Sequence, residues 1–222
     1  MALEQHKTSI FQDVDQVVAD SHASQTVTII AVTKYVDVDT TSQLIELGVN
    51  HLGENRVDQF LKKYQALANK PVTWHFIGSL QRRKVKDIIN LVDYFHALDS
   101  IKLAQEINKR ADHVINCFLQ VNLSEEASKH GFLRDEIEQA LVAIADMPKI
   151  NLVGLMTMAP LAASQTELED LFAATHQLKE MIKAKKIKNM PMTELSMGMS
   201  GDYPLAIKHG ATFVRIGKLF FQ

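Results

Sequence analysis

The segment TVTIIAVTKYVDVDTTSQLIELGVNHLGEN, residues 26–55, contains one complete unit of the pattern that decides the fold. It begins with the β-branched and apolar run 26–34, continues with a helical period over 40–47 and ends in the short run 51–55. Gly48 directly follows the helical stretch and is a typical helix stop, because glycine tolerates the left-handed conformation. The segment therefore predicts a strand, a crossover helix and a second strand parallel to the first.

The same alternation repeats to the end of the chain. Further strands are expected at 73–78, 94–99, 114–123, 150–158, 192–198 and 212–217. A helix is expected over the first 20 residues, and another follows the strand at 51–55 and runs through residue 67. The remaining helices are expected at 84–92, 101–110, 135–147, 166–186 and 203–209. Apolar strands joined by helical crossovers predict a parallel sheet. The eight units favour an α/β fold, a single (β/α)8 barrel domain over residues 1–222, and a doubly wound sheet is the alternative. The last strand lacks a long helix of its own, so the N-terminal helix before strand one is expected to cover that position.

Composition narrows the classes of partner. The 222 residues are 46% hydrophobic and 23% charged, which excludes disordered and coiled-coil classes. The net charge is −2, from 24 basic and 26 acidic residues, so no nucleic acid partner is expected. Cys117 is the single cysteine, and neither a signal-peptide pattern nor a membrane-length apolar run is present. A cytoplasmic protein without membrane contact is predicted, and a monomer, because no coiled-coil seam is visible.

Polar residues stand where the expected strands end, and in a barrel these ends carry the chemistry. They are Lys34, Asn55, His75, Asp99, Asn122, Thr157, Ser196, Ser200 and Arg215. Their convergence predicts a small-molecule site, although Asn, Asp, Ser and Thr also begin helices. Helix capping is favoured for Asp99, and both interpretations stay open for Asn122 and Thr157. His75 and His96 lie on apolar strands and are expected to be hydrogen-bonded core residues, and no metal site is predicted.

Lys34 and Arg215 are cations in strands that are expected to be buried, so each needs an anionic or hydrogen-bonding partner. A salt bridge to Glu54 or Glu194 is one possibility, and a ligand is the other. A lysine in a desolvated barrel mouth suits imine formation, because burial frees the amine. The segments SMGMSGDY (196–203) and RIGK (215–218) offer backbone N–H groups and a hydroxyl for a phosphate.

Eight motifs together resemble the pyridoxal-phosphate homeostasis proteins. They are AVTK (31–34), LGENRVDQ (52–59), WHFIGSLQRRK (74–84), HALDS (96–100), QVNLSEEASKHGF (120–132), GLMTMAP (154–160), ELSMGMSGDYPLAI (194–207) and VRIG (214–217). The resemblance implies a barrel similar to the N-terminal domain of alanine racemase, with pyridoxal 5′-phosphate held as an imine on Lys34. It also implies that Arg215 faces the pyridine nitrogen and that Ser200, with the backbone of Gly217 and Lys218, cradles the phosphate.

The full set of cofactor-binding residues expected from the resemblance and the strand ends is Lys34, Asn55, His75, Ser196, Ser200, Arg215, Gly217 and Lys218. The sequence departs from the family pattern at two places. Ser79 replaces the usual proline of FIGPLQ. Lys218 replaces the usual threonine after RIG, which removes a hydroxyl contact to the phosphate but keeps the backbone N–H.

Three functions are compatible with this site. The first is a protein without robust catalysis that buffers pyridoxal phosphate or delivers it to apo forms of dependent enzymes, and so affects amino and keto acids. The others are a racemase-like enzyme and a cofactor-free aldolase that uses Lys34. An arginine at the ring nitrogen keeps that nitrogen unprotonated, which makes a poor electron sink. No second acid–base domain is expected after strand eight, and Arg215 has no role in an aldolase. The first function, with no catalytic residue, is therefore favoured.

Overall fold

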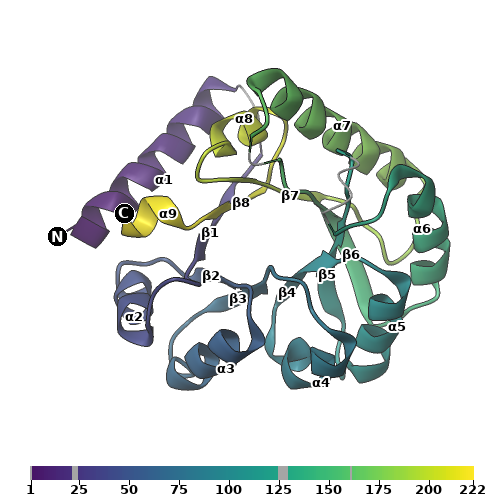
Figure 1. The fold of residues 1–222 in the computed structure, drawn as a ribbon, viewed down its shortest axis with the longest axis horizontal. Helices are drawn as coiled ribbons and strands as arrows, with labels where there is room; N and C mark the ends of the chain where they lie inside the picture. Colours follow the sequence, from purple (N-terminus) through teal and green to yellow (C-terminus); the bar gives the residue numbers. More distant parts are fainter. Residues whose placement is uncertain (1, 22–24, 125–129, 161) are drawn as a thin grey trace.

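The computed structural model describes residues 2–21, 25–124, 130–160 and 162–222 and shows a closed barrel (Figure 1). Its parallel strands are β1 Thr28–Val32, β2 His51–Glu54, β3 Thr73–Phe76, β4 Tyr94–Leu98, β5 Ile115–Gln120, β6 Ile150–Met156, β7 Glu194–Met199 and β8 Phe213–Ile216. They follow one another around the barrel in sequence order, and pairing of β1 with β8 closes it. The predicted (β/α)8 barrel is confirmed and the doubly wound sheet is wrong. Residues 125–129 of the motif at 120–132 lie outside the described residues.

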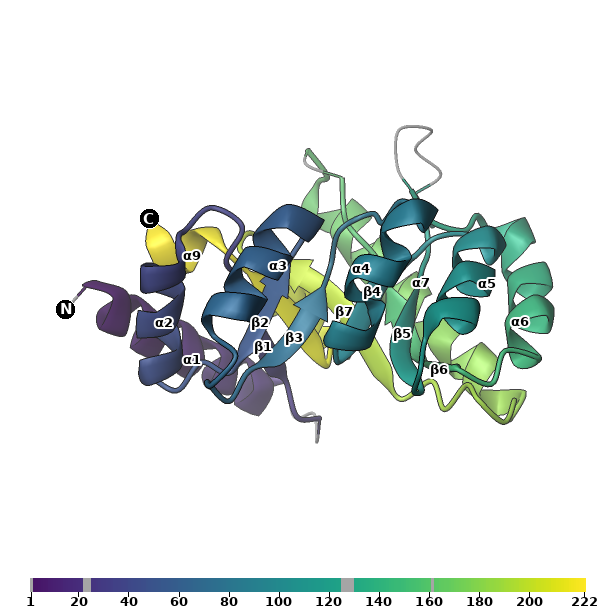
Figure 2. The same ribbon diagram turned by 90° about the horizontal axis from the view of Figure 1, so that it is seen from below.

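A ring of helices covers the outside of the strands (Figures 1 and 2). It contains α2 Val38–Glu46, α3 Val57–Ala66, α4 Val85–Ile88, α5 Ile101–Arg110, α6 Ile137–Ala145, α7 Gln165–Ala184 and α8 Tyr203–Lys208. Each long helix buries one stripe, as α5 does with Leu103, Ala104 and Ile107. Gly48 follows α2 with φ +88°, so the predicted glycine stop is confirmed.

The predicted helix at 84–92 is wrong in detail. The chain forms a 3₁₀ turn at Arg82–Lys84, the short α4, and a second 3₁₀ turn at Ile89–Leu91. Val85, Ile88 and Ile89 are all buried against the barrel. These β-branched residues favour a regular helix only weakly, so the segment follows the shape of the core beneath it.

The N-terminal helix α1, Ala2–Asp20, covers the barrel beside β8, as expected. It buries Ile10 and Val14 and packs against α8 and α9 (Figure 1). The short helix α9, Lys218–Phe221, was not expected from the sequence. Its Phe220 is fully buried, and the Phe220 carbonyl lies 3.0 Å from His6 Nδ1 of α1. The two chain ends therefore close this side of the barrel together.

The interior of the barrel is largely aromatic. Phe118 and Phe213 both contact the rings of His96 and Tyr94. His75 stacks on Tyr94, with the two ring centres 4.9 Å apart. Cys117 on β5 is fully buried, and burial raises the pKa of its thiol. In the described part of the chain, no helix combines the length and the apolar character that a bilayer crossing requires.

Candidate functional site

A cavity of about 720 Å³ opens over the carboxyl ends of the strands. Its polar lining comes from Lys34 after β1, Asn55 after β2, Ser79 after β3, Gln120 at the end of β5, Ser200 and Asp202 after β7, Arg215 within β8, and Lys218 after β8. The backbone of Gly78, Gly201 and Gly217 completes this lining. The volume and the convergence of polar groups from several strands are typical of a small-molecule site.

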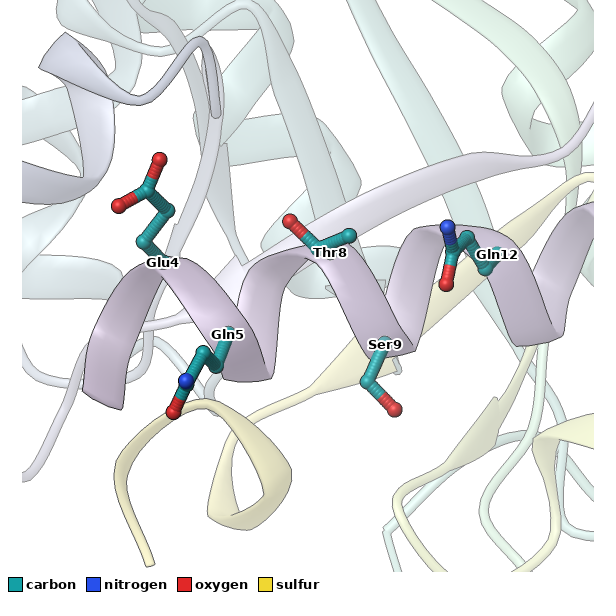
Figure 3. Close-up of a pocket in the computed structure, with 5 residues that line it drawn as sticks. All are labelled: Glu4, Gln5, Thr8, Ser9 and Gln12. Carbon is teal, nitrogen blue, oxygen red and sulfur yellow. The ribbon is translucent and has the colours of Figure 1, made fainter. Parts of the chain in front are cut away.

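A second hollow lies on the outer surface of α1. Its lining residues are Glu4, Gln5, Thr8, Ser9 and Gln12, and Figure 3 shows them spaced along this one helix. The side chains do not converge on a common point. This hollow therefore lacks the polar groups from several elements that define the cavity over the barrel.

Lys34 lies at the cavity mouth, two residues beyond the end of β1. Its side chain is exposed, with Nζ 4.8 Å from the ring centre of Tyr35, so the expectation of a buried lysine is wrong. The strand ends earlier than the sequence indicates, which places Lys34 in the loop and not in the sheet. The proposed salt bridge to Glu54 is also wrong, because another lysine occupies that carboxylate.

The partner of Glu54 is Lys63, a residue of α3 that the sequence did not bring to attention. Lys63 Nζ lies 2.5 Å from Glu54 Oε1 and 2.6 Å from the carbonyl oxygen of Thr33, and both ionic side chains are at most 1% exposed. The Thr33 hydroxyl donates to the same carboxylate oxygen at 2.6 Å. Thr33 precedes Lys34 and Glu54 precedes Asn55, so this buried ion pair supports two residues of the cavity.

Arg215 is buried as expected, with 5% of its surface exposed, and it lines the cavity floor. Its Nη1 donates to Ser196 Oγ at 2.7 Å and its Nη2 donates to the carbonyl of Thr157 at 2.9 Å. The proposed pairing with Glu194 is therefore wrong. Burial lowers the pKa of Arg215 to about 10, which still leaves the guanidinium protonated at neutral pH.

Ser200, Gly217 and Lys218 meet at one side of the cavity. The backbone N–H of Gly217 donates to Ser200 Oγ at 3.3 Å, which joins the loop after β7 to the end of β8. Asp202, a residue of the segment SMGMSGDY for which the sequence predicted no role, also lines the cavity. It accepts a hydrogen bond from the Met199 N–H at 2.5 Å, and burial raises the pKa of its carboxyl.

Two of the eight expected binding residues lie beneath the cavity and do not line it. His75 and Ser196 are fully buried in the barrel interior. His75 Nδ1 lies 2.9 Å from His96 Nε2, and His96 Nδ1 lies 2.9 Å from Ser196 Oγ. The expectation that both histidines are hydrogen-bonded core residues is confirmed, and burial lowers the pKa of both well below the usual histidine range.

The remaining strand-end residues serve local structure. The cap of α5 is Ser100, whose hydroxyl accepts from the Leu103 N–H, so the prediction that Asp99 caps this helix is wrong. Asp99 instead lies 3.5 Å from the imidazole of His130, and burial raises the pKa of its carboxyl.

Asn122 and Thr157 cap no helix among the described elements and do not line the cavity. The Thr157 hydroxyl donates to the carbonyl of Val121 at 3.3 Å, and Asn122 Oδ1 accepts from the Ser124 hydroxyl at 3.2 Å. β5 ends at Gln120, before the predicted boundary, so Gln120 reaches the cavity in place of Asn122.

Comparisons with known proteins agree with this geometry. A family model described as the N-terminal domain of alanine racemase matches residues 15–222. The chain is 35% identical to a pyridoxal phosphate homeostasis protein of Aquifex aeolicus over 87% of this chain and 85% of that one. It is 33% identical to the protein of that name from Pasteurella multocida, over 100% of this chain and 97% of that one.

A solved structure gives the same result at the level of the fold. PipY of Synechococcus elongatus, with pyridoxal phosphate bound, is 28% identical and superposes with a TM-score of 0.87. The alignment covers 99% of this chain and 100% of PipY. The family model and the identity to these relatives over most of the chain agree with the barrel fold. The chain therefore belongs to the pyridoxal phosphate homeostasis protein family, whose fold is that of the alanine racemase N-terminal domain.

Proposed function

We propose that residues 1–222 form one domain that binds pyridoxal 5′-phosphate in the cavity over the barrel and takes part in the homeostasis of this cofactor. The observation that carries the proposal is the charge of the cavity. Three cationic side chains, Lys34, Arg215 and Lys218, line it together with one carboxylate, Asp202. A cavity with a surplus of positive charge suits a phosphorylated ligand.

The lining also fits the other groups of this cofactor. Asn55 Oδ1 is buried and has no hydrogen-bond partner in the described part of the chain, so polar capacity is left for a ligand. Arg215 is fixed from below by Ser196 and Thr157, and its remaining N–H groups are left for the cavity. The Gly217 N–H donates to Ser200 Oγ, which leaves the Ser200 hydroxyl proton to donate to a phosphate, and the backbone N–H of Lys218 offers a further donor beside it. We assign the imine to Lys34 because the AVTK motif at 31–34 resembles the lysine-bearing motif of the family and because Lys34 lines the cavity.

When bound, the cofactor would supply an aldehyde that can condense with the amine of Lys34 with loss of water. Arg215 would hold the pyridine ring by donating to its nitrogen, and because a guanidinium only donates, that nitrogen would stay unprotonated and the ring would stabilise carbanions poorly. This supports buffering or delivery, with apo forms of pyridoxal-phosphate enzymes as recipients, over robust catalysis. The proposal includes a monomer in the cytoplasm, where a buried thiol such as Cys117 stays reduced.

Reduction with borohydride tests the covalent part of the proposal. After addition of pyridoxal 5′-phosphate, we expect a visible absorption band, and after reduction a label on the peptide that contains Lys34. Lys34→Ala should lose both the band and the label but retain phosphate-dependent binding. In the control Lys218→Ala, the label should remain on Lys34. A full label on Lys34→Ala would place the imine on another lysine.

Ser200→Ala tests the phosphate cradle separately from the imine. The loss of a hydrogen bond to an anion should weaken cofactor binding by about 1.5–3 kcal/mol without removing the visible band. Fluorescence titration measures this affinity, and Ser42→Ala on the remote helix α2 is the matched control. Equal affinities of Ser200→Ala and the parent protein would remove Ser200 from the site.

A further inference from the structure

A row of hydrogen-bonded side chains crosses the barrel interior beneath the cavity. It begins at His51, the first residue of β2, whose Nδ1 lies 2.9 Å from His75 Nε2. It continues through His96 on β4 to Ser196 on the opposite wall, at β7. It ends at Arg215 on β8, so the row connects the amino-terminal end of the barrel with the cavity floor.

The chemistry of Arg215 gives this row one direction. A guanidinium only donates, so Ser196 Oγ accepts from Nη1. Among the described residues, the Ser196 hydroxyl has one further hydrogen-bond partner, His96 Nδ1. Because a buried hydroxyl proton is rarely left without an acceptor, we assign this proton to the bond with His96 Nδ1. His96 Nδ1 is then an acceptor and its Nε2 carries the proton.

The same reasoning passes from one ring to the next. His96 Nε2–H donates to His75 Nδ1, and His75 Nε2–H donates to His51 Nδ1. All three rings then carry the Nε2–H tautomer, and the Nδ1 acceptor of each ring lies on the side of the guanidinium of Arg215. This orientation is favourable because the negative end of each imidazole dipole faces the buried positive charge. His51 is half-buried at the far end, where burial lowers the pKa of its imidazole and the negative charge of Asp93 opposes this shift.

The surroundings hold the rings in this arrangement. His75 stacks on Tyr94 with an interplanar angle of 6°, and His96 stacks on Phe118 with ring centres 4.3 Å apart. Phe213 contacts both imidazoles. In the described part of the chain these histidines do not converge on a common point in the manner of metal ligands.

We propose that His96 and Ser196 are positioning residues that fix the guanidinium of Arg215 in the cavity floor, through a one-way chain of neutral histidines that reaches His51. The role of Arg215 toward a ligand rests on the proposed function, but the chain itself does not. Ser196 and His75 thus belong to the support of the site, which explains why they lie below the cavity.

Nuclear magnetic resonance of the ¹⁵N-labelled protein without added ligand tests the chain directly. Two-bond ¹H–¹⁵N spectra at neutral pH should show His51, His75 and His96 as neutral Nε2–H tautomers, with His→Gln variants for assignment. An Nδ1–H tautomer or a doubly protonated ring at His75 or His96 would overturn the inference. This measurement needs no cofactor, so it stands even if pyridoxal phosphate does not bind.

The positioning role is tested with Ser196→Ala and two probes. Affinity for pyridoxal 5′-phosphate should fall about tenfold because Arg215 loses an acceptor, and the His96 nitrogen signals should shift. Affinity for inorganic phosphate should remain that of the parent, because Ser196 does not contact the cradle. Ser196→Thr restores the hydroxyl and should restore the His96 signals, and His113→Gln on the surface is the control. An equal loss for both probes would show general loosening of the barrel and contradict the positioning role.

Discussion

Replacement of Lys63 by methionine is expected to lower the free energy of unfolding by about 3–5 kcal/mol, because it leaves the buried carboxylate of Glu54 without a counter-ion. Both side chains are at most 1% exposed, and Glu54 Oε2 already has no hydrogen-bond partner among the described residues. Each kcal/mol corresponds to a decrease of ~2–4 °C in Tm for a domain of this size. Thermal and urea unfolding measure the effect.

The matched control is Lys70→Met, which removes the exposed pair between Lys70 and Glu46. The two side chains of this pair are 36% and 62% exposed, so the expected change is below about 1 kcal/mol. The double variant Lys63→Met with Glu54→Gln should recover part of the loss, since it removes both charges. If Lys63→Met unfolds like Lys70→Met, the buried ion pair does not support the barrel.

Gly78→Ala is expected to destabilise the protein and to impair the cavity at the same time. A Cβ on Gly78 would lie 2.2 Å from the carbonyl oxygen of Asn55, and 2.7 Å from the carbonyl carbon of the same residue. These are backbone atoms of the residue directly after β2, so the clash can be relieved only if the backbone itself shifts. The loss should exceed the ~1–3 kcal/mol typical of overpacking, and displacement of Asn55 should weaken ligand binding.

Gly201→Ala is the matched control, because Gly201 also lines the cavity but has no atom within 4 Å of an added Cβ. Its unfolding should resemble that of the parent protein. Urea unfolding and titration with pyridoxal 5′-phosphate of both variants give the comparison. Equal behaviour of the two alanine variants would show that the approach of Gly78 to Asn55 is not essential.

The order of the elements was predictable from the sequence for a physical reason. Strands buried on both faces must be apolar and crossover helices must be amphipathic, so the alternation of the two periods is written along the chain. Because parallel strands all point the same way, the site was expected at their carboxyl ends. Six of the expected site residues line the cavity: Lys34, Asn55, Ser200, Arg215, Gly217 and Lys218. The family motifs added the proposed ligand.

Element boundaries were less predictable, and they changed the site. β1 ends at Val32 and β5 ends at Gln120, both before the expected ends. This shift places Lys34 in an exposed loop and brings Gln120, not Asn122, to the cavity. Where a strand stops depends on its pairing with neighbouring strands, and local composition carries little of that information.

The sequence by itself determined the barrel, the face that carries the cavity and most of the residues around it, because these follow from hydrophobic periodicity and from the direction of parallel strands. Only the tertiary structure decided which side chains pair with one another in the interior. Lys63 reaches Glu54 because α3 folds back over the end of β2, and Ser196 meets both His96 and Arg215 because β7 faces β4 across the barrel and pairs with β8. Such contacts join residues that are distant in the chain, so the choice of partner is set by how the closed barrel brings its walls together.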